Sequence, residues 1–148
     1  MTEIRISKPG PYPDDRRIVE VAAGLVFRKG RLLITRRRPE DHLGGYWEFP
    51  GGKREPNETS EACLQRELSE ELGIVVRVDE LLGCVTHRYP EKTVRLEFYR
   101  CTWRRHKPRA LGCQDFAWVT QREVGSYVFP PADRKLLRRL RVTDHFWR

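Results

Sequence analysis

The sequence lacks the long apolar runs that would direct it to a membrane. Its longest apolar runs fall far short of the ~20 residues that a membrane-spanning helix needs. Its first residues contain no apolar stretch of the kind found in secretory signals. Internal repeats and low-complexity segments are also missing. We therefore expect a cytoplasmic protein without a membrane partner, and 148 residues suffice for one well-packed domain but not for two.

Cysteine is scarce and scattered, which argues against both a disulfide framework and a zinc site. The four cysteines are Cys63, Cys84, Cys101 and Cys113, and no two of them form a Cys-x-x-Cys pair. This spacing is typical of reduced, mostly buried thiols.

Acidic residues are fewer than basic ones. The chain has 29 Lys and Arg against 21 Asp and Glu, which gives a formal net charge of +8. An excess of this size attracts polyanions, including nucleotides and nucleic acids. The arginine runs are separated in sequence, however, and no known nucleic-acid-binding motif surrounds them. Charge alone leaves open a phosphate-handling enzyme, a nucleic-acid binder and a merely well-solvated surface.

The order of the expected elements predicts an α/β protein. Hydrophobic patterning and turn residues predict strands over residues 18–27, 31–35, 46–49, 74–87, 93–103 and 116–120, and helices over residues 59–72 and 131–140. Strands on both sides of a central helix favour a mixed sheet with helices on both faces. The proline-rich residues 1–17 are expected to form a flexible arm before a single domain of residues 18–148, and residues 144–148 a frayed, partly docked tail.

Three glutamates in the first predicted helix form the most informative cluster. Glu67, Glu70 and Glu71 are spaced i, i+3 and i+4, so a helix directs their carboxylates toward one place. Like charges this close repel each other, and a fold keeps such a cluster mainly where divalent cations neutralise it. The all-oxygen ligand set suits Mg²⁺ or Mn²⁺ better than zinc. The alternative is a surface helix with a solvated acidic face.

The residues around these glutamates resemble the Nudix box. The pattern Gly-x5-Glu-x7-Arg-Glu-apolar-x-Glu-Glu-x-Gly-apolar runs from Gly52 to Ile74, and every fixed position is filled. The resemblance covers residues 18–141. It implies the Nudix fold, an α/β/α sandwich with a mixed β-sheet, and hydrolysis of a phosphoric anhydride.

The resemblance also implies roles for single residues. The cofactor is expected to be Mg²⁺, with Mn²⁺ able to substitute. The expected metal ligands are the backbone carbonyl of Gly51 and the carboxylates of Glu67, Glu70 and Glu71. Glu67 and Glu70 are also candidate catalytic residues, one of them as general base, and Arg66 pairs with Glu58 to hold Glu67 in its working rotamer. A plain surface role for each glutamate and a structural ion pair for Arg66 remain open.

One position departs from the family pattern. Many MutT-like members carry Glu-x-Gln-x-x-x-Trp late in the fold, where the glutamate binds metal or acts as base. Here Gln114 and Trp118 match, but Gly112 occupies the acidic position. Asp115 could substitute only from a strand position whose side chain points the other way. Catalysis is then expected to depend more fully on the helix glutamates.

Further segments resemble the MutT-like branch, which hydrolyses nucleoside triphosphates such as 8-oxo-dGTP to monophosphate and pyrophosphate. By this resemblance the substrate-binding residues are Arg37, Phe49, Lys53 and Asp133. The best-known members have Asn where Asp133 stands, and Asp resembles relatives with broader or pyrimidine-tolerant preference. An ionised Asp only accepts hydrogen bonds, whereas Asn also donates. Alternatively, Phe49 is simple core, Arg37 a solvated charge, and Asp133 a carboxylate in a helix's first turn.

Three other functions stay open at this level. The enzyme could remove pyrophosphate from RNA 5′ ends, in which case nucleic acid is a partner only as that end, or it could hydrolyse another nucleoside-diphosphate derivative. A third possibility is a non-catalytic module that reads an oxidised base, like the MutT-like domains attached to base-excision glycosylases. The expected partner is a nucleotide substrate, and the expected assembly is a monomer or homodimer.

Overall fold

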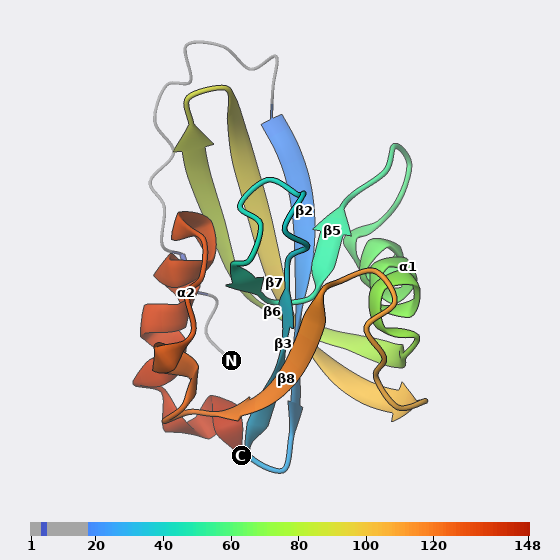
Figure 1. The fold of residues 1–148 in the computed structure, drawn as a ribbon, viewed down its shortest axis with the longest axis vertical. Helices are drawn as coiled ribbons and strands as arrows, with labels where there is room; N and C mark the ends of the chain where they lie inside the picture. The colour runs from blue at the N-terminus through green and yellow to red at the C-terminus, as the bar shows by residue number, and fades with distance from the viewer. Residues whose placement is uncertain (1–3, 6–17) are drawn as a thin grey trace.

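A mixed β-sheet with one helix on each side forms the core of the computed structural model, which describes residues 4–5 and 18–148 (Figure 1). In this part of the chain the strands are β1 (Ile4–Arg5), β2 (Ile18–Arg28), β3 (Arg31–Arg36), β4 (Trp47–Glu48), β5 (Gly51–Lys53), β6 (Val75–Tyr89), β7 (Lys92–Arg105) and β8 (Asp115–Thr120). The helices are α1 (Ser60–Leu72) and α2 (Pro131–Arg141), with short 3₁₀ helices at Val124–Ser126 and Asp144–Trp147. The predicted α/β sandwich with a mixed sheet is confirmed.

Strand β2 is the centre of this sheet. It runs parallel to β7 and antiparallel to β5, and its last two residues pair with the start of β3. β3 in turn pairs with β4 and β8, while β7 pairs with β6 over most of its length. This topology places β5, β4 and the end of β3 near one another beside the central strand.

Helix α1 begins and ends at the residues expected from the sequence. The side-chain hydroxyl of Thr59 accepts a hydrogen bond from the backbone N–H of Ala62 at 3.1 Å, which caps the first turn. Gly73 adopts the left-handed conformation, with φ of 68°, and its N–H returns to the carbonyls of Leu68 and Ser69. Both ends are therefore fixed by local chemistry, which sets the rotation of the helix and thus the direction of its glutamates.

The two faces of the sheet bury separate apolar clusters. The first lies under α2, where Leu136, Leu137 and Leu140 pack against strand residues such as Phe98. The second lies under α1, where the predicted stripe of Leu64, Leu68 and Leu72 is fully buried. The carboxylate face of α1 is consequently turned to the side, along β5.

Three features differ from the sequence prediction or extend it. The tail is not frayed: Phe146 and Trp147 are only 3% and 5% exposed, and the Trp147 indole N–H donates to the carbonyl of Leu140 at 2.9 Å. Both side chains belong to the first apolar cluster, which outweighs the entropy of a free end. Ile4 and Arg5 pair in parallel with β6, while residues 1–3 and 6–17 of the predicted arm lie outside the described residues.

The remaining difference is β5: no strand was predicted beyond residue 49 in this region, but Gly51, Gly52 and Lys53 form one. All four cysteines are free thiols, as predicted, and three of them are buried.

No helix within residues 18–148 is long and apolar enough to cross a membrane.

Candidate active site

The carboxylate of Glu67 lies directly on the backbone of β5. A Cβ atom at Gly52 would overlap this carboxylate, so only glycine leaves the space that Glu67 occupies. Gly51 is equally confined, because a Cβ there would collide with the backbone carbonyl of Ala22 in β2. The paired glycines therefore bring the backbone of β5 close to both the central strand and the acidic face of α1.

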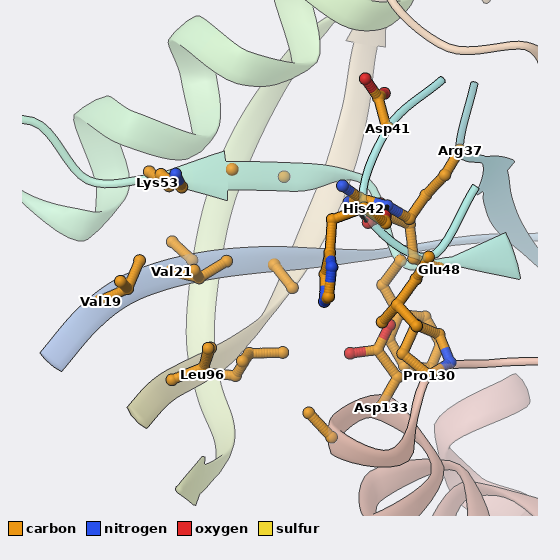
Figure 2. A pocket seen from close by; sticks show the side chains of 18 of the residues that line it. Val19, Val21, Arg37, Asp41, His42, Glu48, Lys53, Leu96, Pro130 and Asp133 are labelled. Carbon is orange, nitrogen blue, oxygen red and sulfur yellow. Dashed lines mark hydrogen bonds and ion pairs between the residues drawn. The ribbon is translucent and has the colours of Figure 1, made fainter. Parts of the chain in front are cut away.

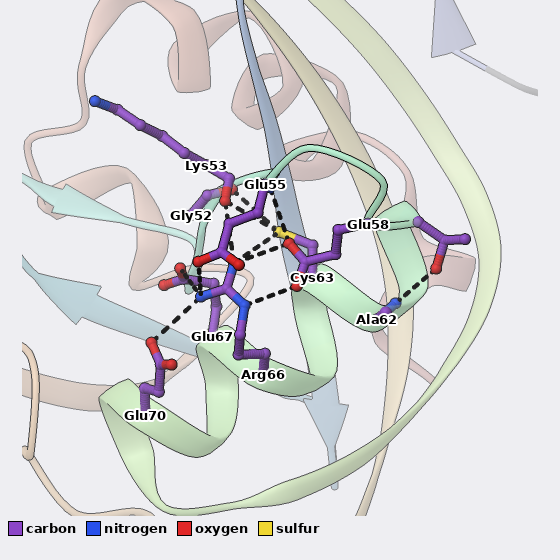
Figure 3. A network of polar contacts seen from close by, with 10 residues as sticks. Gly52, Lys53, Glu55, Glu58, Ala62, Cys63, Arg66, Glu67 and Glu70 are labelled. Carbon is purple, nitrogen blue, oxygen red and sulfur yellow. Dashed lines mark hydrogen bonds and ion pairs between the residues drawn. The ribbon is translucent and has the colours of Figure 1, made fainter.

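Arg66 is the centre of an ion-pair network around Glu67 (Figure 3). Its Nε and Nη2 atoms donate to both oxygens of Glu58 at 2.7 and 2.9 Å, and its Nη1 donates to Glu67 at 2.8 Å. The paired hydrogen bonds lower the pKa of Glu58 to about 2 and raise the pKa of Arg66. The structure thus contains the predicted pair of Arg66 and Glu58, and Arg66 also contacts Glu67; that this contact holds Glu67 in its working rotamer stays a prediction.

The three helix glutamates do not converge as closely as the sequence predicted. The carboxyl groups of Glu71 and Glu67 share a hydrogen bond, but Glu70 is 60% exposed and turned toward Arg66 at 3.3 Å. Within residues 4–5 and 18–148, no three acidic, histidine or cysteine side chains are grouped closely enough to hold a metal ion. One physical reason is helix geometry, since the consecutive residues Glu70 and Glu71 do not face each other. In addition, Glu70 contacts the Arg66 guanidinium.

The donor set nevertheless fits a hard divalent cation. It consists of carboxylate oxygens and the backbone of β5, with no competing sulfur or imidazole ligand among the candidate residues. Burial and the nearby charges of Glu48 and Glu67 raise the pKa of Glu71 to about 9. That shift measures how strongly this place disfavours another negative charge, and a bound cation would remove the penalty.

A cavity of about 340 Å³ extends from this acidic end toward α2, and we call it the Asp133 cavity (Figure 2). Gly51, Gly52 and Glu71 line one end, and Phe49 and Asp133 line the other. The predicted substrate residues Arg37 and Lys53 line it as well. The structure thus brings one set of candidate metal ligands and all four candidate substrate residues to one cavity, while Glu67 and Glu70 lie in the neighbouring network.

Arg37 is held rigidly in this cavity by a residue that the sequence did not single out. Its Nη1 donates to both oxygens of Glu48 at 2.8 and 3.0 Å, and its Nε donates to the carbonyl of His42 at 2.6 Å. Burial alone would lower the pKa of Arg37, but the Glu48 carboxylate outweighs it and the pKa is raised. Glu48 follows Trp47 in a two-residue strand, and a single Glu there carries no spacing that marks it as functional.

Asp133 is buried at the far end of the cavity, in the first turn of α2. It is 6% exposed, and the backbone N–H of Phe49 donates to its carboxylate. Burial, followed by the negative charge of Glu48, raises its pKa well above that of an ordinary aspartate. This direction favours the protonated form of Asp133, which has an O–H donor as well as acceptor oxygens, whereas the ionised Asp assumed from the sequence only accepts. Phe49 is 3% exposed and packs on Phe98 and Phe129, so it is core and cavity wall together.

Gly112 lies against the helix end that carries Glu71. Its N–H donates to the carbonyl of Glu71 at 3.0 Å, and a Cβ at Gly112 would meet the Cα of Glu71 at 3.1 Å. Asp115 is exposed, and its carboxylate accepts a hydrogen bond from the N–H of Phe116. The position that lacks the family's glutamate is therefore adjacent to the site, although its own residue adds no carboxylate.

Comparison with known proteins points to the family that the Nudix-box pattern indicates. Residues 22–139 match the NUDIX domain family. The chain is similar to the 8-oxo-dGTP diphosphatase of Haemophilus influenzae, with 36% identity over 132 residues that cover 88% of this chain and 97% of that protein. It is also similar to the CTP pyrophosphohydrolase of Escherichia coli, with 32% identity over 82% of this chain and 90% of that protein.

Its fold is similar to the crystal structure of the MutT protein from Methanosarcina mazei, with a TM-score of 0.76, 24% identity and coverage of 85% of this chain and 94% of that chain. The family match, the filled Nudix box and the Glu67–Arg66–Glu58 geometry agree with one another. The chain is therefore a MutT-like member of the NUDIX hydrolase family.

Proposed function

We propose that this protein is a Mg²⁺-dependent nucleoside triphosphate pyrophosphohydrolase, with Mn²⁺ able to substitute, that removes 8-oxo-dGTP or a related damaged or surplus nucleotide. The observation that carries this proposal is the Asp133 cavity, because it joins the Glu71 and Gly51 end to a polar pocket suited to a base. A nucleotide laid along it would have its phosphates at the acidic end and its base between Arg37 and Asp133. The names of the similar 8-oxo-dGTP diphosphatases support the same substrate class.

The candidate metal ligands, Arg66 and Lys53 have different roles in the proposed reaction. When a divalent cation is bound by the Gly51 carbonyl and the carboxylates of Glu67, Glu70 and Glu71, it neutralises charge that develops on the phosphate oxygens. Arg66 keeps the Glu67 carboxylate in a fixed orientation. The exposed Lys53 at the cavity attracts the triphosphate.

The direct test is the identity of the products. With Mg²⁺ and a set of candidate triphosphates, we expect equal amounts of nucleoside monophosphate and pyrophosphate, measured by anion-exchange chromatography. Released orthophosphate with a nucleoside diphosphate would contradict the proposal. The same assay with a 5′-triphosphorylated oligonucleotide tests the alternative of an RNA 5′-end pyrophosphohydrolase, since phosphate contacts along an RNA steepen the dependence on salt.

A pyrimidine triphosphate is the second candidate substrate. One observation favours it: the similar E. coli protein is named a CTP pyrophosphohydrolase. The non-catalytic reader is set aside, because every Nudix position is filled and the similar proteins are named as hydrolases.

Asp133→Asn is expected to remove a pH dependence of base preference. The raised pKa of Asp133 keeps its carboxyl protonated above the usual range, and the O–H donor is lost as pH rises through that pKa. A buried hydrogen bond lost in this way changes the ratio of kcat/KM for two bases by about tenfold. We expect the ratio for 8-oxo-dGTP over CTP to change with pH in the wild type and to stay flat in Asp133→Asn.

Arg134→Ala is the control, because Arg134 is exposed in the same helical turn and should leave the wild-type profile unchanged. The same pH profile in the wild type and Asp133→Asn would show that Asp133 does not select the base.

A further inference from the structure

A second cavity, of about 620 Å³, lies on the α1 side of the sheet beyond the end of the helix, and we call it the basic cavity. Four cationic side chains line it: Arg28, Lys29, Arg31 and Lys107. The rest of its wall consists of the aromatic rings of Trp103, Phe116 and Trp118 together with Pro108. It shares no lining residue with the Asp133 cavity, and its lining contains no carboxylate.

The β2–β3 hairpin concentrates positive charge at this place. Arg28 and Arg31 are direct cross-strand partners, and like charges in that arrangement destabilise a sheet. Lys29 adds a third charge from the turn, where it adopts a φ of 50°. Within the part of the chain that the structure describes, none of these three residues forms an ion pair with a carboxylate. Arg31 acts on one carboxylate without forming an ion pair with it. The pKa of Glu123 is lowered, first by its hydrogen bonds with Thr120 and then by the positive charge of Arg31.

The aromatic wall is held in a fixed orientation. The Trp103 indole N–H donates to the carbonyls of Arg105 and His106 at 3.1 and 2.7 Å, and its ring lies 5.9 Å from that of Trp118. Phe116 and Trp118 are two residues apart on β8, so they point to the same face. All three rings are only partly buried, because one side packs on the apolar cluster under α1 and the other borders the cavity.

Arg28 shows that these rings already attract a planar cationic group. Its guanidinium carbon lies 4.2 Å from the centroid of the Trp103 ring. A single ligand in the cavity could therefore contact both the aromatic rings and the cationic side chains. This lining disfavours two classes of ligand. Metal cations would be repelled by the four charges, and an uncharged apolar ligand would gain nothing from them.

We propose that the basic cavity binds the base-and-phosphate unit of a nucleotide, either free or within a single-stranded nucleic acid. Aromatic side chains that stack bases beside a basic groove are the usual means of holding such a unit without reading its sequence. The four cationic side chains would neutralise the phosphate. The same contact would reduce the electrostatic repulsion between Arg28 and Arg31. This binding requires neither the helix glutamates nor a metal ion, so it goes beyond the proposed function and stands or falls separately from it.

The test compares two doubly substituted proteins that carry the same change in net charge. Arg28→Glu with Lys107→Glu reverses charge in the basic cavity, and the hairpin should still form because the introduced carboxylate would face Arg31 across the strands. Arg138→Glu with Arg139→Glu reverses two exposed charges on α2 and is the control. Binding of a fluorescein-labelled decathymidylate without a 5′ phosphate, and of AMP, is measured by anisotropy and by tryptophan quenching, in EDTA so that no metal-dependent turnover occurs.

We expect the cavity variant to weaken binding by about tenfold or more, and the control to bind as the wild type does. The slope of log K against log salt for decathymidylate should fall by about 0.7 for each phosphate that the variant no longer neutralises. Trp118→Phe, which keeps a ring in place, should reduce the tryptophan quenching. Tighter binding of decathymidylate than of AMP identifies nucleic acid as the source of the unit, and equal binding identifies free nucleotide.

Equal weakening in both charge-reversed proteins would show a net-charge effect only and would overturn the proposal. So would the absence of binding of both probes to the wild-type protein. Triphosphate hydrolysis with Mg²⁺ should be unchanged in the cavity variant, which separates this result from any failure of the proposed function.

Discussion

Glu70→Gln is expected to lower kcat by about a hundredfold or more at saturating Mg²⁺, because it removes one negative charge from the candidate metal ligands. The thermal midpoint of the variant should equal that of the wild type. The Glu70 side chain is 60% exposed, and its ion pair with Arg66 at 3.3 Å is one of several that Arg66 makes. Exposed pairs of this kind contribute little to stability. A large loss of turnover without a loss of stability would therefore assign Glu70 to the chemistry.

The measurement needs kcat, the thermal midpoint and Mn²⁺ affinity for the same protein. Glu61→Gln is the matched control, since Glu61 is an exposed glutamate in the first turn of the same helix. We expect Glu61→Gln to behave as the wild type does in all three measurements. Intact turnover in Glu70→Gln would contradict the metal-site assignment, and weakened Mn²⁺ binding together with lost turnover would support it.

Gly52→Ala should abolish most activity while leaving the protein folded. The added methyl group would occupy the space of the Glu67 carboxylate, which is the far end of a flexible side chain and can turn away. Glu67 would then leave the place where Arg66 holds it, and kcat should fall by about a hundredfold, since displacement by ~1 Å already costs that much. Gly51→Ala should behave differently, because its methyl group would meet the rigid backbone carbonyl of Ala22 and lower the thermal midpoint.

Gly125→Ala provides the control for crowding by a methyl group. A Cβ there would also meet the end of a flexible side chain, the guanidinium of Arg141, but outside the residues that line the Asp133 cavity. We expect its kcat to be that of the wild type. If Gly52→Ala kept full turnover, the position of Glu67 on β5 would not matter for catalysis.

The elements that could be predicted from the sequence are those with strong local rules. Thr59 and Gly73 carry the chemistry of a helix start and a helix stop, so α1 was placed correctly. The long apolar patterns of β6 and β7 were equally clear. The resemblance to the Nudix box also predicted that Arg66 pairs with Glu58, and the structure contains this pair.

The parts that were missed depend on partners far away in sequence. β5 is a strand only because β2 lies beside it, and its glycines have low strand propensity of their own. Glu48 became part of the site through a hairpin-like pairing of β3 with β4 that brings Arg37 back to it. The tail docks because Phe146 and Trp147 find an apolar cluster built from other segments. In each case the decisive interaction is tertiary.

The arrangement around Arg66 has a thermodynamic consequence for how the site responds to cations. One guanidinium contacts the carboxylates of Glu58, Glu67 and Glu70, so its single positive charge offsets part of their combined negative charge. Under the proposed metal assignment this arginine competes with an ion, because it already contacts carboxylate oxygens of Glu67 and Glu70. The apparent affinity for a divalent ion is therefore a difference between two attractions, and any substitution that weakens the hold of Arg66 shifts that balance toward the ion.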